Sequence, residues 1–206
     1  MILLGKEAEK TLRGLPIARS EYVKDSSHMV KLAKKFHFPL VLKIISEKAV
    51  HKTEIKGVRI VASEAELRKN YIEMAKIAKR LKGKIMAQEF IKGRELIIGI
   101  KKDPVFGHAI MFGIGGTMVE LLHDVSFRIC PITERDAESM INELKYKKLL
   151  DEFRGEKAVN IKLIKNILVK VSNLPARNRK ISELDINPLI ANDKVAKIVD
   201  ARIMLG

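Results

Sequence analysis

The sequence predicts a mixed fold of α-helices and β-strands, because helical and extended patterns alternate along its 206 residues. Alternating apolar and polar residues mark a strand at 183–189, and a nearly continuous apolar run marks another at 40–45. Apolar residues at helical spacing follow a capping signal at Ser63. No internal repeat is present, and the length suits one domain or two closely joined lobes.

The first half of the chain is expected to contain a short helix, two strands and a long helix. Ser26 and Ser27 are predicted to cap a helix that leads to Phe36. The runs at 40–45 and 57–62 are predicted strands on either side of a polar connection. The long amphipathic helix follows, with its apolar positions at Leu67, Tyr71, Met74, Ala78 and Leu81.

The second half is expected to combine strands with two amphipathic helices. Strands are predicted at 84–90, 95–101 and 108–112, the last two joined by a turn at 103–107. Thr133 and the acidic residue three positions later predict the start of one helix. The other helix has apolar residues at Ile161, Ile164, Ile167, Leu168 and Val171.

The composition excludes several functional classes. The 40 Lys and Arg residues outnumber the 25 Asp and Glu residues and give a net charge of +15, which attracts polyanions. With 7 Phe, 3 Tyr and no Trp for base stacking, a dedicated nucleic-acid function is not expected. Phosphorylated substrates, an acidic partner subunit or ion-pair networks explain the charge with fewer assumptions. No apolar run suits a membrane span or a secretory signal, so we expect a cytoplasmic protein without a membrane partner.

The single cysteine, Cys130, excludes an internal disulfide and a zinc site with several thiolates. Its apolar neighbours favour a buried structural thiol over a nucleophile.

The strand at 183–189 carries acidic and amide side chains on one face. Glu183, Asp185 and Asn187 share that face because successive side chains of a strand alternate, and a second predicted strand at 199–202 brings Asp200. Mg²⁺ prefers hard oxygen ligands and commonly keeps phosphates and waters in its shell. This edge is therefore a candidate magnesium site of a nucleotide-binding protein, and the alternative is a solvated strand face.

Two residues near the first predicted strand pair are candidates for phosphate chemistry. Lys43 interrupts the apolar run at 40–45, where its charge either contacts a nucleotide phosphate or reaches solvent along the open face of the strand. His51 lies in the polar connection that follows, and an imidazole there is either a phosphoryl acceptor and acid–base group or simply exposed.

A glycine-rich run and an arginine are further candidates for anion binding. Gly113, Gly115 and Gly116 follow a predicted strand, where backbone amides can cradle a phosphate, although the run lacks both common phosphate-binding fingerprints. A tight turn is the alternative for these glycines. Arg128 is flanked by apolar residues, and its alternative is a structural ion pair.

Several segments taken in order resemble the ATP-grasp β subunits of ADP-forming acyl-CoA synthetases, which include acetate–CoA ligase (ADP-forming) and are related to the β chain of succinyl-CoA synthetase. The matching stretches cover nearly the whole chain and are 41–44, 51–53, 88–90, 93–95, 103–107, 111–116, 124–128, 183–189 and 199–203. The resemblance implies an α+β ATP-grasp fold whose two lobes grip a nucleotide. The smaller lobe is expected at about 20–88, and the larger at about 89–206 together with 1–19.

The resemblance also implies roles for individual residues. Lys43 is expected on the nucleotide phosphates, Glu89 and Ile91 at a hinge facing the adenine, and Glu95 near the nucleoside. Asn187 and Asp200 are expected to hold Mg²⁺ beside ATP or ADP. His51 is expected to act as a second phosphoryl relay, with Asp185 as its carboxylate partner.

The primary phosphohistidine and the CoA-binding domain of such synthetases lie on a separate α subunit, so a hetero-oligomer is expected. The chain contains neither part and is therefore expected to be incomplete as a synthetase. The alternative is an ATP-grasp module that senses nucleotides without catalysis.

Overall fold

The computed structural model describes residues 1–48, 56–116, 124–152 and 155–206. Within these ranges, no helix combines the length and the apolarity needed to cross a membrane.

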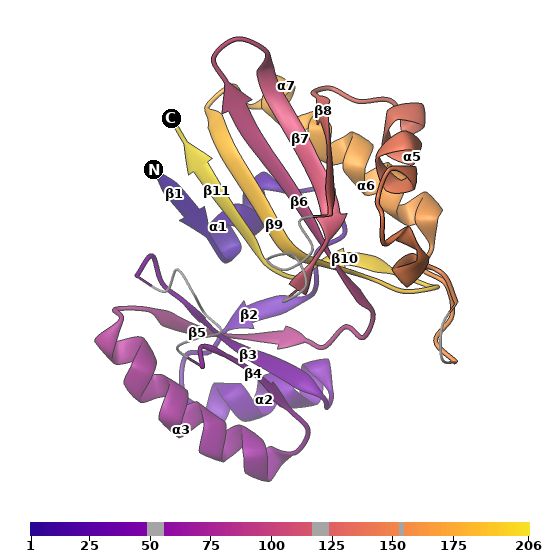
Figure 1. Ribbon diagram of the computed structural model, residues 1–206. Helices are drawn as coiled ribbons and strands as arrows, with labels where there is room; N and C mark the ends of the chain where they lie inside the picture. The colour runs from indigo at the N-terminus through magenta and orange to yellow at the C-terminus, as the bar shows by residue number, and fades with distance from the viewer. Residues whose placement is uncertain (49–55, 117–123, 153–154) are drawn as a thin grey trace. The chain divides into compact units, whose positions relative to one another are not determined.

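The chain forms two compact units, and each unit is built from one β-sheet and its own helices (Figure 1). The mixed α and β class predicted from the sequence is therefore confirmed. We call them the small unit and the large unit. The small unit comprises Leu4–Lys6 and Ala18–Ile91, and the large unit comprises Met1–Leu3, Glu7–Ile17 and Lys92–Gly206.

The small unit contains a four-stranded sheet in the order β2-β5-β3-β4. Its central strands are buried because α2 and α3 contribute apolar side chains to the same core. The strands are β2 (Ser20–Tyr22), β3 (Leu40–Ile45), β4 (Val58–Val61) and β5 (Lys84–Glu89), and the helices are α2 (Ser26–Phe36) and α3 (Glu64–Arg80). Every strand that the sequence predicted in this region is present, with ends shifted by one residue or less.

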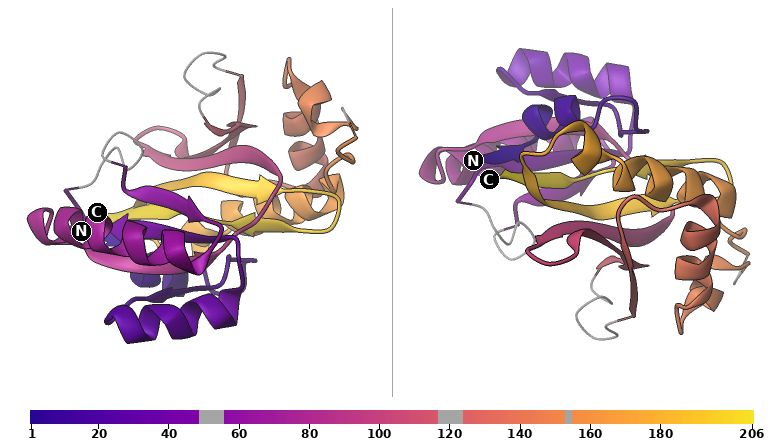
Figure 2. Two further views of the ribbon diagram at one scale, coloured as in Figure 1. Left: turned by 90° about the horizontal axis from the view of Figure 1, so that it is seen from below. Right: turned by 90° about the horizontal axis from the view of Figure 1, so that it is seen from above.

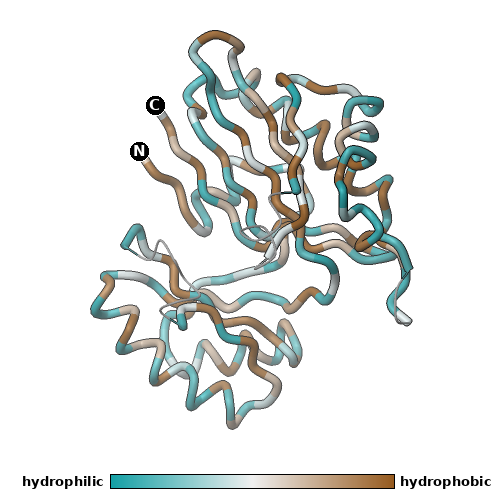
Figure 3. The backbone as a smooth tube through the Cα atoms, in the orientation of Figure 1, coloured by the Kyte–Doolittle hydropathy of each residue, from teal (hydrophilic) through white to brown (hydrophobic). Residues whose placement is uncertain are grey.

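The caps of the two helices in the small unit differ from each other. The predicted cap of α2 was wrong, because Asp25 accepts a hydrogen bond from the His28 amide at 2.8 Å and both serines lie inside the helix. The carboxylate is a strong acceptor for an unpaired amide at a helix start. For α3, Ser63 caps the helix as predicted. Figure 3 shows hydrophobic and hydrophilic residues alternating along α3, as an amphipathic helix requires.

The large unit contains a seven-stranded sheet in the order β1-β11-β9-β6-β7-β8, with β10 also paired to β9. The strand β9 pairs antiparallel with β6, β10 and β11, so it has neighbours along its whole length. The strands are β1 (Ile2–Leu4), β6 (Arg94–Asp103), β7 (Gly107–Ile114), β8 (Val125–Ile129), β9 (Ile181–Ala191), β10 (Ala196–Ile198) and β11 (Ala201–Leu205).

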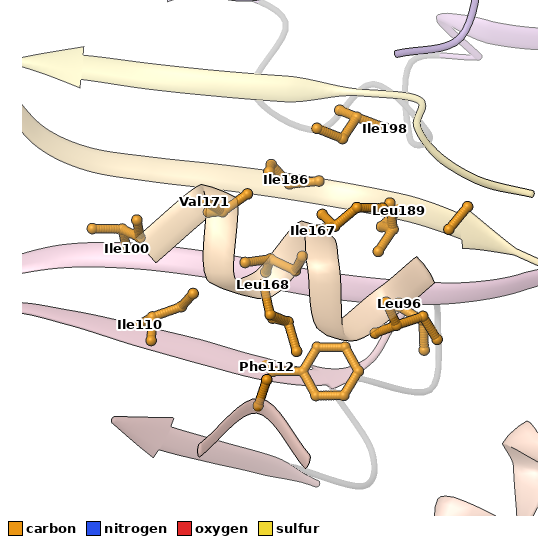
Figure 4. Close-up of a cluster of buried hydrophobic side chains, with 14 of the residues drawn as sticks. Leu96, Ile100, Ile110, Phe112, Ile167, Leu168, Val171, Ile186, Leu189 and Ile198 are labelled. Carbon is orange, nitrogen blue, oxygen red and sulfur yellow. The ribbon is translucent and has the colours of Figure 1, made fainter. Parts of the chain in front are cut away.

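One face of this sheet is covered by helices that share its hydrophobic core. In Figure 4, Ile167, Leu168 and Val171 of α6 lie against side chains of β6, β7 and β9. The helices of the large unit are α1 (Lys6–Thr11), α5 (Glu134–Asn142), α6 (Ile161–Ser172) and α7 (Leu174–Arg177), with a 3₁₀ turn at Lys147–Leu150. The predicted cap of α5 is present as a complete capping box.

The alternation predicted for β9 is confirmed. Leu184 and Ile186 are buried on the helix-covered face, whereas Asp185 and Asn187 are exposed on the other. Asp200 lies one residue before β11 rather than inside a strand, so the predicted second strand begins two residues late. The open face of the sheet therefore presents the polar side chains that the sequence placed together.

The shortest elements were not predicted from the sequence. The strand β1 contains three residues and is defined by its pairing at the end of the sheet. The amino group of Met1 donates to the carbonyl of Leu205 at 2.8 Å, and the two termini lie side by side (Figure 2). A strand this short is stabilised by long-range pairing, and three residues are too few for an alternating pattern to predict it.

Candidate functional site

The open face of the large sheet brings together the predicted carboxylate and amide residues. Asp185 lies between Gly99 of β6 and Arg202 of β11 in the strand register. The amide of Asn187 donates to the carbonyl of Asp200 at 3.2 Å, so the backbones of these two residues are adjacent. The junction of β9 with the start of β11 thus gathers three of the predicted site residues.

A hollow of about 400 Å³ lies on the same face. Gly99 and Ala109 line the hollow, and neither residue has a large side chain that would fill it. The hollow is lined by charged residues of both signs, among them Asp185 and Arg202, which are opposite each other in the pairing of β9 with β11. The other residues that line it are Ile100, Lys101, Met111, Phe127, Glu183, Leu184 and Met204. A hollow with apolar walls and a few charged groups suits a polar ligand or a segment of a partner protein.

The donors at this junction fit Mg²⁺ only with further oxygen ligands. Asn187 and Asp200 supply one amide oxygen and one carboxylate, both hard ligands. Among the described residues, no three His, Cys, Asp or Glu side chains are grouped for a metal ion. A magnesium ion here would therefore take the rest of its shell from phosphates and water, which is usual for this ion.

Glu95 and two of the predicted phosphate-binding glycines lie together in the large unit. The amide of Gly115 donates to the carbonyl of Glu95 at 2.7 Å. Gly116 has φ +71°, in the left-handed region, and a Cβ atom there would collide with the carboxylate of Glu95. Glu95 also pairs with Ile190 of β9, three residues from Asn187 along that strand. The structure therefore places this cluster on the same strand pair as the carboxylate site.

Gly113 has a structural explanation instead. It lies inside β7 and pairs with Val125 of β8. A Cβ atom at this position would stand 2.6 Å from the carbonyl oxygen of Asp124. Glycine is thus required by the close approach of two strands, which is a different reason from the phosphate cradle considered for the run.

Arg128 forms the ion pair that was its alternative interpretation. Its guanidinium binds the carboxylate of Glu143 through both terminal nitrogens, one of them at 3.0 Å. The guanidinium holds the pKa of Glu143 below its usual value, because it donates hydrogen bonds to the ionised carboxylate. The same contact raises the pKa of Arg128. The side chain therefore links β8 to the residue that follows α5.

In the small unit, Lys43 lies on the central strand β3. The register places it between Val58 of β4 and Met86 of β5, and the residue is 3% exposed. Exposure this low contradicts the alternative in which its charge reaches solvent along an open strand face. A buried ammonium requires compensating polar or charged groups, as expected of a lysine that binds an anion.

Glu89 and Ile91 lie at the end of β5 and just beyond it. The Glu89 carboxylate accepts hydrogen bonds from the backbone amide of Arg19 at 2.8 Å and from its Nε at 2.9 Å. Glu89 is buried and Ile91 is half-buried. His51, the predicted relay residue, lies outside the described residues.

Three comparisons with known proteins bear on this arrangement. A model of the ATP-grasp domain family matches residues 2–205. The β subunit of acetate–CoA ligase (ADP-forming) I from Pyrococcus furiosus is 39% identical, with 98% of this chain and 91% of that protein covered. The chain belongs to the ATP-grasp β subunits of ADP-forming acetate–CoA ligases. The fold and family expected from the sequence are therefore confirmed.

Two solved structures of an acetyl-coenzyme A synthetase 1 from Ca. Korarchaeum cryptofilum match this ATP-grasp chain closely. One, in complex with coenzyme A and Ca-AMPCP, has a TM-score of 0.91 and 44% identity, with 100% of this chain and 93% of the other covered. The second contains coenzyme A and Mg-AMPPCP, and its phosphohistidine segment points towards the nucleotide-binding site. Its TM-score is 0.85 and its identity 42%, with the same coverage of 100% and 93%.

In this ATP-grasp chain, two arginines that the sequence did not indicate as candidates lie beside predicted site residues. Arg202 of β11 pairs with Asp185 of β9, which lies 17 residues earlier in the sequence. Arg19 contacts Glu89, which lies 70 residues later. The alternation around Asp200 could have placed Arg202 on the face of Asp185. For Arg19, no local pattern indicates the contact.

Cys130 is expected to react slowly with thiol reagents. The thiol is half-buried, and burial raises its pKa to about 11, since the thiolate loses hydration. At pH 8 the thiolate fraction is then about 200-fold smaller than for an ordinary thiol of pKa near 8.5. Alkylation of the folded chain followed by mass spectrometry should show this lag, and the rate should climb as the pH rises towards 11. Labelling as fast as in the urea-unfolded chain would contradict it.

Proposed function

We propose that the chain is the nucleotide-binding β subunit of an ADP-forming acyl-CoA synthetase and moves a phosphoryl group between phosphohistidine and ADP. The overall reaction is acyl-CoA + ADP + phosphate ⇌ carboxylate + ATP + CoA. The observation that carries the proposal is the gathering of Asp185, Asn187 and Asp200 at one strand junction. This junction occurs in a chain that matches β subunits along nearly its whole length.

We assign the nucleotide-binding roles residue by residue within each unit. In the small unit, the buried ammonium of Lys43 binds the phosphates, while Glu89 and Ile91 face the base. In the large unit, Glu95 binds the nucleoside. Gly115 and Gly116 lie beside it, and because the amide of Gly115 already donates to the carbonyl of Glu95, the phosphate contact of this run falls to the amide of Gly116. Gly113 and Arg128 are the least supported of this set, because a strand contact and an ion pair account for them.

Phosphoryl transfer requires a nucleophile and groups that stabilise charge. We assign His51 as a second relay that accepts the phosphoryl group from a histidine of the partner subunit and passes it to ADP. The first step exchanges one P–N bond for another, and the second exchanges a P–N bond for the P–O bond of ATP. We assign Asp185 as the carboxylate partner of His51, the role in which a carboxylate orients a catalytic histidine and stabilises its positive charge.

Asn187 and Asp200 are the residues that would hold Mg²⁺. When bound, the ion neutralises charge on the phosphate oxygens. The amide oxygen and the single carboxylate leave positions in its shell for nucleotide phosphates.

The partner is a CoA-binding α subunit. Two relatives from Pyrococcus furiosus are named as β subunits, and one solved relative contains a phosphohistidine segment that points towards its nucleotide-binding site. We propose that this chain likewise receives a phosphohistidine segment from an α subunit in a hetero-oligomer.

The decisive experiment mixes the purified chain with a cognate α subunit, acetyl-CoA, ADP, phosphate and magnesium. ATP should form, and omission of either subunit should abolish it. If ADP binds but no acyl-CoA supports ATP formation, the chain is a nucleotide-sensing module rather than a synthetase subunit.

A further inference from the structure

The turn at 103–107 connects β6 to β7 and extends past the neighbouring strands of the large sheet. The pairing of β6 with β7 continues as far as Asp103 and Gly107. By contrast, the pairing of β6 with β9 ends at Lys101, and that of β7 with β8 ends at Ala109. In Figure 1 this turn is the loop at the top of the large unit. It therefore projects beyond the end of the sheet, where a partner can reach it.

Two large apolar side chains occupy the tip of this turn. Val105 is 78% exposed and Phe106 is 69% exposed. Apart from the terminal Met1, no other large apolar residue in the described ranges is as exposed. A single apolar side chain on a surface is common, but two adjacent ones at a projecting tip form a small apolar patch. Contact with a partner would remove both from water, which is favourable.

The conformation of the turn is fixed by its own side chain and backbone. Oδ1 of Asp103 accepts hydrogen bonds from the backbone amides of Val105 and Phe106, each at 2.8 Å. These bonds hold the pKa of the carboxyl below its usual value, because they favour its ionised form. Gly107 completes the turn with φ +82°, in the left-handed region. A turn fixed in this way loses less conformational entropy when a partner binds its tip.

Basic residues flank the base of the turn. The start of β9 lies beside the hairpin, because Nε2 of His108 forms a hydrogen bond with the carbonyl of Ile181 at 2.8 Å. The residues just before β9 are therefore close to the turn. In the segments 102–108 and 178–182, Asp103 is the one acidic residue, and it is engaged by backbone amides. The exposed basic residues of these segments, which we call the basic collar, are Lys102, Arg179 and Lys180.

We propose that this turn docks the chain on its α subunit, with Val105 and Phe106 in an apolar pocket that has an acidic rim. The inference rests on the proposed function, which requires such a subunit. The basic collar favours a partner of opposite charge, whereas a second copy of this chain, with its net charge of +15, would bring like charges together. A bilayer is disfavoured, because the two side chains have fewer carbons than a myristoyl chain, which alone binds membranes marginally.

The readout is the affinity of the full chain for the purified cognate α subunit, measured by calorimetry. The double variant Val105→Ser with Phe106→Ser should raise the dissociation constant about a hundredfold, because a central aromatic anchor carries much of the binding energy of an interface. Its affinity for ADP should stay unchanged and shows that the variant is folded. Ile72→Ser is the matched control, since Ile72 is an apolar residue of α3 that is 59% exposed, and it should not change the affinity for the α subunit.

A second double variant tests the acidic rim. Lys102→Gln with Lys180→Gln removes two charges of the basic collar and leaves the apolar tip in place. It should weaken the association several-fold at low salt and should make the association less sensitive to added salt. A salt dependence equal to that of the unchanged chain would contradict an acidic rim.

ATP formation separates docking from the proposed function. At concentrations of α subunit above the raised dissociation constant, the serine variant should regain the full rate, because its nucleotide-binding residues are intact. The docking role is excluded if the serine variant binds the α subunit as tightly as the unchanged chain does. It is equally excluded if the serines abolish only self-association or binding to phosphatidylserine vesicles. If the serines weaken α-subunit binding but the unchanged pair forms no ATP, docking stands and the proposed function fails.

Discussion

ATP formation by the reconstituted synthetase is expected to fall about 10³-fold when Asp185 is replaced by asparagine. Asparagine keeps the shape of the side chain but removes the charge that orients and stabilises a histidine. Asp185 is exposed on the open face of the sheet, so the substitution leaves the core residues on either side of it in place. The rate of ATP formation at saturating ADP measures the effect.

Asp193→Asn is the matched control for this prediction. Asp193 lies in the turn after β9 and pairs with Lys157 at 3.8 Å, away from the hollow. The control removes the same charge from the same hairpin and should retain full activity. Full activity of Asp185→Asn would remove this carboxylate from the relay, whereas equal losses in both variants would point to a general effect of charge.

The hydrophobic pattern correctly predicted those elements in which the burial of each side chain follows from local strand or helix geometry. The strand β9 alternates, and its buried and exposed positions follow that alternation. The helix α3 was predicted from its spacing of apolar residues, and Leu67, Met74 and Ala78 are buried as expected. These features depend on local geometry, which the sequence encodes directly.

Contacts that depend on strand register were not predictable from the same patterns. Gly99 lies beside Asp185 only because β6 and β9 pair in one register, with an irregularity between Leu96 and Ile98. A shift of one residue would place a different side chain there. The pairing of Arg19 with Glu89 likewise follows from the register of β2 with β5. The candidate residues could thus be named from the sequence, but their neighbours could not.

The glycine-rich run illustrates how one motif can have several causes. Gly113 permits two strands to approach, whereas Gly116 adopts a backbone conformation that favours glycine beside Glu95. From the sequence, a phosphate cradle and a tight turn were alternative explanations for the whole run. The structure separates the positions, and only Gly115 and Gly116 lie next to another residue predicted to bind the nucleotide.

Replacing Lys43 with methionine is expected to weaken ADP binding about a hundredfold, the upper part of the range for a hydrogen bond to a charged group. Methionine has a similar volume and suits a strand in which every residue is buried, so the sheet should tolerate it. The interaction that is lost should be the one between the ammonium and the phosphates of ADP. Adenosine, which has none, should bind Lys43→Met and the unchanged chain equally, and calorimetry with ADP and adenosine separates the two contributions.

Lys84→Met provides the comparison for the loss of a positive charge. Lys84 begins the neighbouring strand β5, is exposed, and lies over the ring of Tyr22 at 5.4 Å. Its removal should change the affinity for ADP little, because an exposed charge is screened by water and salt. If Lys43→Met binds ADP as tightly as Lys84→Met does, the buried ammonium serves the fold rather than the nucleotide. A selective loss for ADP, with adenosine unaffected, requires instead that the charge of Lys43 acts on the phosphates, since no effect on packing distinguishes the two ligands.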